Sequence, residues 1–244
     1  ALGFGINSEP FERLAMSLPL KFIGKHSDSQ LSIEALLFGQ AGFLDNINGN
    51  DTYTSLLKQE YDFLANKFTL VKPASLGWKT ARMRPPNFPH RRIAFLAAIL
   101  FGGFKMMSKI LDTRSVDDLP RLFNVEFTGY WATHYTFGER SEKPVAAALS
   151  RSSISVLAIN VVVPLMHAYS LSVDNRELTA LAVNLLQELK PESNTIISLF
   201  NAGGIQCPDA WTSQALIQLR REYCETKKCL YCRIGHRMLS KCAK

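Results

Sequence analysis

Apolar residues recur along most of the chain at the three- and four-residue spacing of one face of an α-helix. The clearest stripe comprises Leu178, Leu181, Leu185, Leu186 and Leu189. Asp174 and Glu177 form a capping box ahead of this stripe and Pro191 follows it, so we expect a helix between them. Alternating strand patterns with hairpin turns are missing. The pattern therefore predicts an all-α protein.

The same spacing predicts helices over Glu34–Leu44, Tyr53–Phe68, Phe88–Phe101, Val145–Tyr169, Ser193–Asn201 and Pro208–Tyr223, and another that opens at Ser115 and Asp118. We expect about nine or ten helices in one compact domain over residues 1–244, with a Cys-rich basic C-terminal segment. If there is an internal boundary, we expect it near 138–143, between an aromatic-rich and an aliphatic-rich half. Because the chain starts abruptly at Ala1, we expect a fragment of a longer protein.

One apolar run, Ile154–Leu171, is long enough to cross a membrane. It carries Asn160, Pro164 and His167, and polar groups of this kind are costly in lipid. We therefore interpret the run as a buried helix kinked at Pro164. On this interpretation the chain makes no membrane contact and is a soluble cytoplasmic domain.

The net charge of +7 conceals a strong segregation of charge. Residues 63–111 hold nine basic and no acidic residues, and residues 220–244 have a net charge of +6. The remainder of the chain therefore carries a net charge of −8. Such segregation favours an anionic partner, either nucleic acid or the acidic surface of another protein. The alternative is a solvated basic face that serves solubility.

The first basic segment contains an Arg-rich loop that leads into a helix. Its candidate anion-binding residues are Arg82, Arg84, Asn87, His90, Arg91 and Arg92. Asn87 suits the N-cap and Pro89 the first helical turn. Cations in a first turn oppose the helix dipole, which indicates an anion shared with the free N–H groups there. That anion could be a nucleic-acid phosphate, a small ligand, or an internal Asp or Glu that clamps the loop.

Cysteines gather at the C-terminus in the pattern C-x4-C-x2-C-x9-C. The members are Cys224, Cys229, Cys232 and Cys242, with His236 between the last two and Cys207 upstream. This arrangement is typical of thiolate metal ligation, with Cys224, Cys229 and Cys232 as ligands and Cys242, His236 or Cys207 as the fourth. Zinc is the first expectation. The alternatives are an iron–sulfur cluster, as in the weakly similar loop of helix-hairpin-helix DNA glycosylases, and free thiols without metal.

Two further groups of polar residues are candidates for binding. Lys227, Lys228, Arg233 and Arg237 form a possible second basic patch around the cysteines. Gln214 and Gln218, four residues apart, share a helix face that would suit either a ligand or buried backbone groups. No Walker loop, G-x-G-x-x-G turn, H-E-x-x-H helix or G-x-S-x-G elbow is present, so no catalytic residue can be named.

A resemblance is carried by EALLFGQAGFL, by R-x-R-P-x-N-F-P before a helix, by SQALIQL and by YC-x4-CLYC-x-IG. In this combination the chain resembles, over essentially its whole length, an uncharacterised bacterial family, domain of unknown function 2851. Members of that family are longer at the N-terminus, so the chain is similar to their C-terminal portion. The upstream portion is nuclease-like by analogy of fold. The resemblance brings no established activity.

Three functional hypotheses follow from these residues. The first is a helical accessory domain that binds nucleic acid or another anionic ligand through the Arg-rich loop. The second is a structural or protein-interaction domain that supports a nuclease-like catalytic region upstream or in another chain. The third is a glycosylase-like enzyme, which rests only on the cysteine pattern and the helical content.

Overall fold

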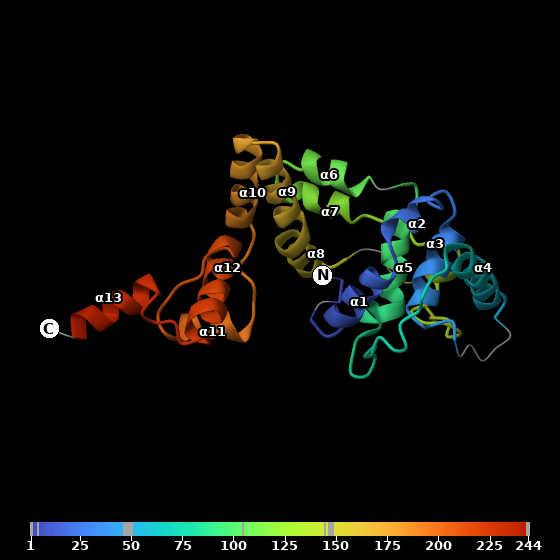
Figure 1. Ribbon diagram of the computed structural model, residues 1–244, viewed down its shortest axis with the longest axis horizontal. Helices are drawn as coiled ribbons and strands as arrows, with labels where there is room; N and C mark the ends of the chain where they lie inside the picture. The colour runs from blue at the N-terminus through green and yellow to red at the C-terminus, as the bar shows by residue number, and fades with distance from the viewer. Residues whose placement is uncertain are drawn as a thin grey trace. The chain divides into compact units, whose positions relative to one another are not determined.

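The computed structural model describes residues 2–3, 5–45, 51–103, 105–143, 145 and 149–242, without the side chains of 238–242. These residues form thirteen α-helices and no strand (Figure 1). The predicted all-α class is confirmed. The helix count is close to the nine or ten predicted, and four helices were not predicted from the sequence: α1 (Ser8–Ser17), α2 (Leu20–Gly24), α6 (Met106–Asp112) and α13 (Arg233–Cys242).

The chain divides into two compact units. The N-terminal unit comprises residues 1–113 and 117–157, and the C-terminal unit comprises residues 114–116 and 158–244. The main division falls after Leu157. That position lies inside a long helical stretch, where no change in composition marks it.

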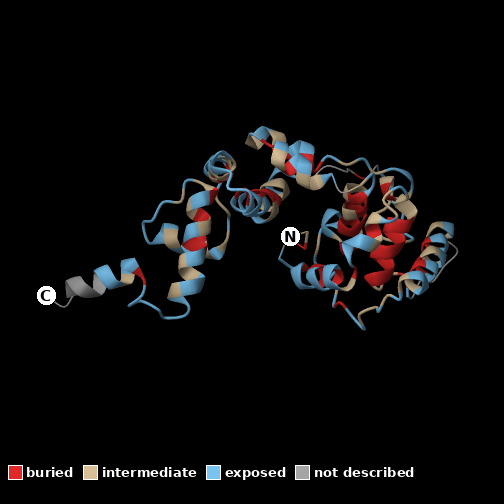
Figure 2. Ribbon diagram, turned by 45° about the horizontal axis from the view of Figure 1, so that its top comes forward, coloured by how far each residue is buried: buried red, intermediate tan, exposed pale blue. Residues whose placement is uncertain are grey.

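In the N-terminal unit, α3 (Gln30–Gln40) is the central helix and packs against α4 (Thr52–Phe68) and α5 (Pro89–Leu100). Every residue from 32 to 40 is buried, and buried positions gather on α3 and α5 (Figure 2). Gly39 is required where α3 meets α4, because a Cβ there would lie 2.1 Å from the ring of Tyr61. The other helices of this unit are α1, α2, α6, α7 (Leu119–Leu122) and α8 (Arg151–Leu157).

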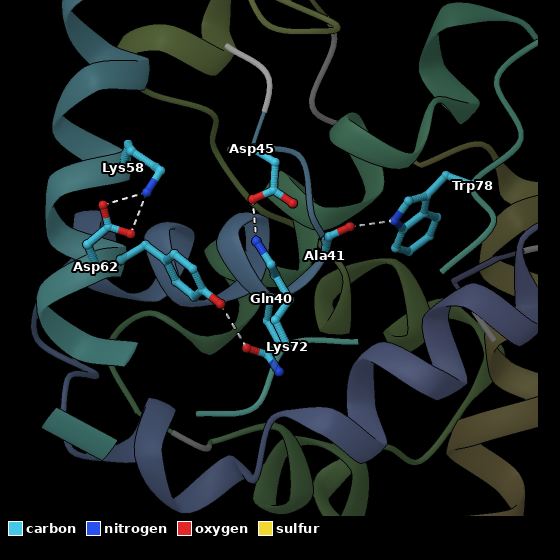
Figure 3. Close-up of polar contacts among 8 residues, drawn as sticks. Gln40, Ala41, Asp45, Lys58, Asp62, Lys72 and Trp78 are labelled. Carbon is cyan, nitrogen blue, oxygen red and sulfur yellow. Dashed lines mark hydrogen bonds and ion pairs between the residues drawn. The ribbon is translucent and has the colours of Figure 1, made fainter. Parts of the chain in front are cut away.

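The Pro-rich segment between α4 and α5 is tied to the core by side chains. Gln40 accepts a hydrogen bond from the Tyr61 hydroxyl at 3.1 Å and donates one to the carbonyl oxygen of Val71 at 2.7 Å. Trp78 donates to the Ala41 carbonyl oxygen at 2.9 Å, and Lys72 pairs with Asp45 (Figure 3). Further on, the Asn7 amide exchanges two 2.9 Å hydrogen bonds with the backbone of Lys79. These contacts fix the path of the chain that carries Arg82 and Arg84.

A buried carboxylate also lies in this core. The Glu34 carboxylate accepts hydrogen bonds from the Tyr53 hydroxyl and, at 2.9 Å, from Gln30. Trp131 in turn donates to the Tyr53 oxygen at 2.9 Å. Burial raises the pKa of Glu34, and the two hydrogen bonds to its carboxylate act in the opposite direction. This network joins α3, α4 and the segment around Trp131, and it satisfies polar groups that the core would otherwise leave unpaired.

The C-terminal unit is built on α9 (Val163–Ser172) and α10 (Arg176–Glu188), which pack together. It continues through α11 (Thr195–Ala202), α12 (Ala210–Gln218) and α13. Asn175 caps α10 by accepting from the backbone N–H of Leu178 at 3.0 Å, so the predicted capping residue Asp174 is one position too early. Asp174 instead takes the left-handed conformation, with φ 49°.

The helix that runs from Arg151 to Ser172 differs from a regular α-helix at one point. A π-helical turn, Ala158–Val162, separates α8 from α9, and Pro164 is the second residue of α9. Proline removes a backbone donor, and a wide turn accommodates the carbonyl groups that it leaves. By length and composition this helix could cross a membrane, and 39% of its most apolar 18-residue window is buried. The core helix of a soluble protein passes the same test.

Candidate anion-binding cleft

A cleft of about 480 Å³ lies in the N-terminal unit beside the start of α5. Its lining comes from three separate stretches of the chain: Arg84, Pro86, Asn87, Arg91, Arg92 and Phe95 from the loop and α5; Phe127; and Leu149, Ser150, Ser152 and Ser153 from the start of α8. The structure thus brings four of the six predicted anion-binding residues into one cavity.

Arg91 is held deep in this cleft, with only 4% of its surface exposed. Its Nη1 donates to the carbonyl oxygen of Trp131 at 2.7 Å. The Phe127 ring lies over the guanidinium, with 3.4 Å between Cζ and the ring centroid. Burial lowers the pKa of Arg91 to about 10, which leaves it protonated at neutral pH. These contacts fix the direction of the guanidinium and keep its positive charge at the cleft.

Arg92 is also buried, and Asn87 holds it. The Arg92 Nη2 donates to the Asn87 Oδ1 at 2.6 Å. Asn87 is therefore not the N-cap that the sequence predicted: it ends a 3₁₀ turn, Pro85–Asn87, and Phe88 occupies the cap position of α5. Pro89 is the first helical residue, as expected. Burial lowers the pKa of Arg92 to about 10, so this side chain is a cation as well.

Arg84 differs from the two buried arginines because its side chain is exposed. It directly precedes the 3₁₀ turn, where its extended backbone brings it to the cleft. Within the described residues its guanidinium forms no ion pair or hydrogen bond. Arg84 is therefore the cation of the cleft that is best placed to meet a ligand from solvent.

The serines of the cleft were not predicted. Ser150 precedes α8, and its Oγ accepts from the backbone N–H of Ser153 at 3.1 Å. The same oxygen lies 2.9 Å from the hydroxyl oxygens of both Ser152 and Ser153. The sequence pattern predicted that this helix starts at Val145. Ser150 was therefore expected inside the helix and was not recognised as a cap. Hydroxyls add small donors that can reorient toward an anion.

Two predicted residues, Arg82 and His90, do not line the cleft. Arg82 is exposed and adopts the left-handed conformation, with φ 59°. His90 points into the aromatic core, where its ring centroid lies 3.9 Å from that of Phe43. Burial lowers the pKa of His90 to about 4, so it is neutral at pH 7. A neutral ring among aromatic side chains cannot supply charge to an anion.

The electrostatic character of the cleft follows from its lining. Three of the described lining residues are arginines, and none is acidic. A second cleft of about 350 Å³, beside the end of α5, differs in this respect because Glu126 lines it together with Lys105 and Lys109. Arginine binds oxyanions through paired N–H groups, whereas a carboxylate repels them. The first cleft is therefore the better oxyanion site.

The model of the family described as "Protein of unknown function (DUF2851)" matches residues 1–195. The chain belongs to the DUF2851 family. The match includes every residue that lines the cleft and stops before the cysteine segment. The comparisons with curated proteins and with solved structures gave no match.

The cysteines of this DUF2851 member lie in the C-terminal unit. Cys224, Cys229 and His236 are exposed and Cys232 is buried. Among the described side chains, no three His, Cys, Asp or Glu residues come together as a metal-binding group, and the side chain of Cys242 lies outside the described part. Cys207 is a poor candidate ligand, because burial and the nearby Asp209 raise its thiol pKa.

The backbone around the cysteines is nonetheless tightly packed. Gly235 lies against Cys229, where a Cβ would come within 2.5 Å of the Cys229 carbonyl oxygen. The glycine thus allows the start of α13 to approach the Cys229–Cys232 turn. In that turn the Cys232 N–H donates to the Cys229 carbonyl oxygen at 3.3 Å.

The remaining predicted residues of the C-terminal unit are mostly on the surface. Lys227, Lys228, Arg233 and Arg237 are all exposed. Gln218 is exposed as well, whereas the Nε2 atom of Gln214 is buried with no hydrogen-bond partner among the described residues. The two glutamines therefore do not face the same environment, although they are four residues apart.

Proposed function

We propose that this DUF2851 chain is an accessory domain that binds nucleic acid by placing a phosphate group in the cleft. The observation that carries the proposal is a cavity lined by three arginines and three serines, with no acidic residue among its described lining. A phosphate offers several strong acceptor oxygens and a negative charge, and both match this set of donors.

The three arginines have different roles in this proposal. Arg84, which is exposed, makes the direct and paired contact with phosphate oxygens. Arg91 and Arg92 are fixed by Trp131 and Asn87, so their charges are already in position before the ligand arrives. A preorganised site loses little conformational entropy on binding. The buried charges also gain from an anion, because they have lost much of their hydration.

Nucleic acid is favoured as the source of the phosphate by the wider distribution of charge. The three arginines of the cleft belong to the segment 63–111, which has nine basic and no acidic residues. Lys79 and Arg82, both exposed, precede Arg84 in the same loop. The C-terminal unit contributes a second basic segment, with a net charge of +6 over residues 220–244. A polyanion can contact several basic segments of one chain, whereas a small ligand contacts only one site.

The test is a binding titration with labelled single- and double-stranded oligonucleotides, followed by fluorescence anisotropy at several salt concentrations. We expect affinity to fall steeply as salt rises. The Arg84→Glu variant should lose at least about tenfold in affinity, since charge reversal replaces attraction with repulsion. Arg121→Glu is the matched control, because Arg121 is an exposed arginine of the same unit that pairs with Asp118 away from the cleft. Binding that ignores salt, or that survives Arg84→Glu unchanged, would refute the proposal.

A further inference from the structure

The size of the cleft bears on which phosphate it accepts. Its volume of about 480 Å³ falls within the roughly 300–1,000 Å³ typical of small-ligand pockets. Proteins that track a nucleic-acid backbone use an extended groove instead. A pocket of this size has room for one nucleotide. A strand therefore reaches the cleft most readily by its end.

The charge of the cleft points the same way. Arg84, Arg91 and Arg92 place three formal positive charges around one cavity. An internal phosphodiester carries one negative charge and two non-bridging oxygens. A terminal phosphomonoester carries about −1.5 to −2 at neutral pH and has three acceptor oxygens. The monoester therefore offsets more of the arginine charge and can accept from the arginines and the serine hydroxyls together.

The apolar part of the lining supplies a place for the rest of the nucleotide. Phe95, Phe127, Leu149 and Pro86 share the cavity with the arginines. Phe127 already packs on Arg91, and this contact gives the site a fixed aromatic edge. Sugar carbons and base faces pack well on such side chains. Inorganic phosphate would leave this part of the lining unused.

From these three observations, we propose that the cleft binds the terminal phosphomonoester of a nucleic-acid strand, together with its nucleoside, in preference to an internal phosphodiester. This proposal rests on the proposed function, because it names the part of the nucleic acid that enters the same site. It assigns phosphate contact to Arg84 and Ser152, and nucleoside contact to the apolar residues.

The experiment compares one oligonucleotide sequence in forms that differ only at the ends: hydroxyl at both ends, 5′-phosphate, or 3′-phosphate. All are measured by anisotropy at one fixed ionic strength. We expect one of the two terminal phosphates to tighten binding by at least about tenfold. Arg84→Gln and Ser152→Ala should remove this gain, and Arg121→Glu should retain it. Thermal denaturation of each variant shows whether the fold is kept, which we expect since Arg84 and Ser152 are exposed.

Competition with small molecules tests the nucleoside contact. A nucleoside 5′- or 3′-monophosphate should displace the phosphorylated strand at a concentration at least about tenfold lower than inorganic phosphate does. Equal competition by the two would overturn the nucleoside part of the proposal.

The possible failures are distinguishable. All three strands could bind equally, with a dependence on salt and on Arg84. That result would refute the preference for a terminal phosphate and leave the proposed function intact. Absence of binding to every strand would refute the proposed function itself. A terminal-phosphate gain that survives Arg84→Gln would place the phosphate elsewhere and overturn the assignment of the cleft.

Discussion

Asn87 and Arg92 are joined by a 2.6 Å hydrogen bond from the Arg92 Nη2 to the Asn87 Oδ1. The contact spans the junction between the 3₁₀ turn and α5. It therefore links the path of the Pro-rich loop to the direction of a buried cation. An asparagine that merely capped the helix would leave Arg92 without this constraint, so the pair connects loop structure with the charge of the cleft.

Replacing Asn87 separates the structural role of this pair from its electrostatic role. Asn87→Ala removes an acceptor for a charged donor, so we expect a loss of about 1–3 kcal/mol in the free energy of unfolding. Asn87→Asp keeps the acceptor and adds a negative charge beside the three arginines. We expect Asn87→Asp to fold with wild-type stability or better but to bind oligonucleotides at least about tenfold more weakly. Chemical denaturation and anisotropy would measure both quantities, and undiminished binding by Asn87→Asp would contradict the prediction.

The difference between His90 and its neighbours shows what sequence could and could not predict. The approach of arginines to the start of α5 was predictable from the loop motif and Pro89, both of which are local. His90 was included with them because it is adjacent in sequence. Successive helical residues point about 100° apart, however, so His90 turns toward Phe38 and Phe43.

The other half of the cleft depends on tertiary contacts that no local pattern contains. Phe127 and Ser150 are more than 30 positions from Arg92 along the chain, and neither belongs to a motif that links it to the loop. The burial of Glu34 could not be predicted from the sequence either, because a glutamate near a helix start is ordinarily exposed. Its burial becomes intelligible only when Tyr53 and Gln30 are seen to donate to it.

Gly39 should be intolerant of even the smallest side chain. The Cβ of an alanine would lie 2.1 Å from the Tyr61 ring, so either α3 and α4 must separate or the ring must move. We expect Gly39→Ala to cost at least about 1–3 kcal/mol of unfolding free energy, despite the higher helix propensity of alanine. In a Tyr61→Ala background the same change should cost much less, since the ring is gone. A double-mutant cycle by chemical denaturation measures this coupling, and additive effects would contradict it.

The cysteine pattern leads to a prediction about metal content. If Cys224, Cys229 and Cys232 bind zinc with a fourth ligand, freshly purified protein should contain about one equivalent of zinc. Paired Cys229→Ser and Cys232→Ser replacements should abolish it, and Cys207→Ser should retain it because the raised thiol pKa of Cys207 disfavours ligation. Gly235→Ala should also lower the zinc content by forcing α13 away from the Cys229 carbonyl oxygen. Elemental analysis and an absorption spectrum would measure the zinc and would also reveal an iron–sulfur cluster. A folded protein without metal would contradict the prediction and show that these cysteines are free thiols.

The packing of His90 among aromatic rings predicts a specific dependence of stability on pH. The pKa of His90 is lowered to about 4 in the folded protein by burial, against an ordinary value of 6.5. Between these values the unfolded chain binds the proton more readily, so the free energy of unfolding falls as the pH drops from about 6.5 toward 4. His90 alone can lower the free energy of unfolding by at most roughly 3 kcal/mol over this pH range. The raised pKa of Glu34 acts with the opposite sign, so total stability alone would not isolate His90.

His90→Phe provides the comparison, because it keeps an aromatic ring and removes the titrating group. We expect the difference in unfolding free energy between the wild type and this variant to be constant above pH 7 and to shift in favour of the variant below about pH 6.5. Urea denaturation at pH 7.5, 6, 5 and 4 would measure it. A parallel pH dependence of the two proteins would show that His90 accepts its proton as readily in the folded state as in the unfolded one. Such a result would contradict the neutral, desolvated ring inferred from its contacts with Phe38, Phe43 and Phe137.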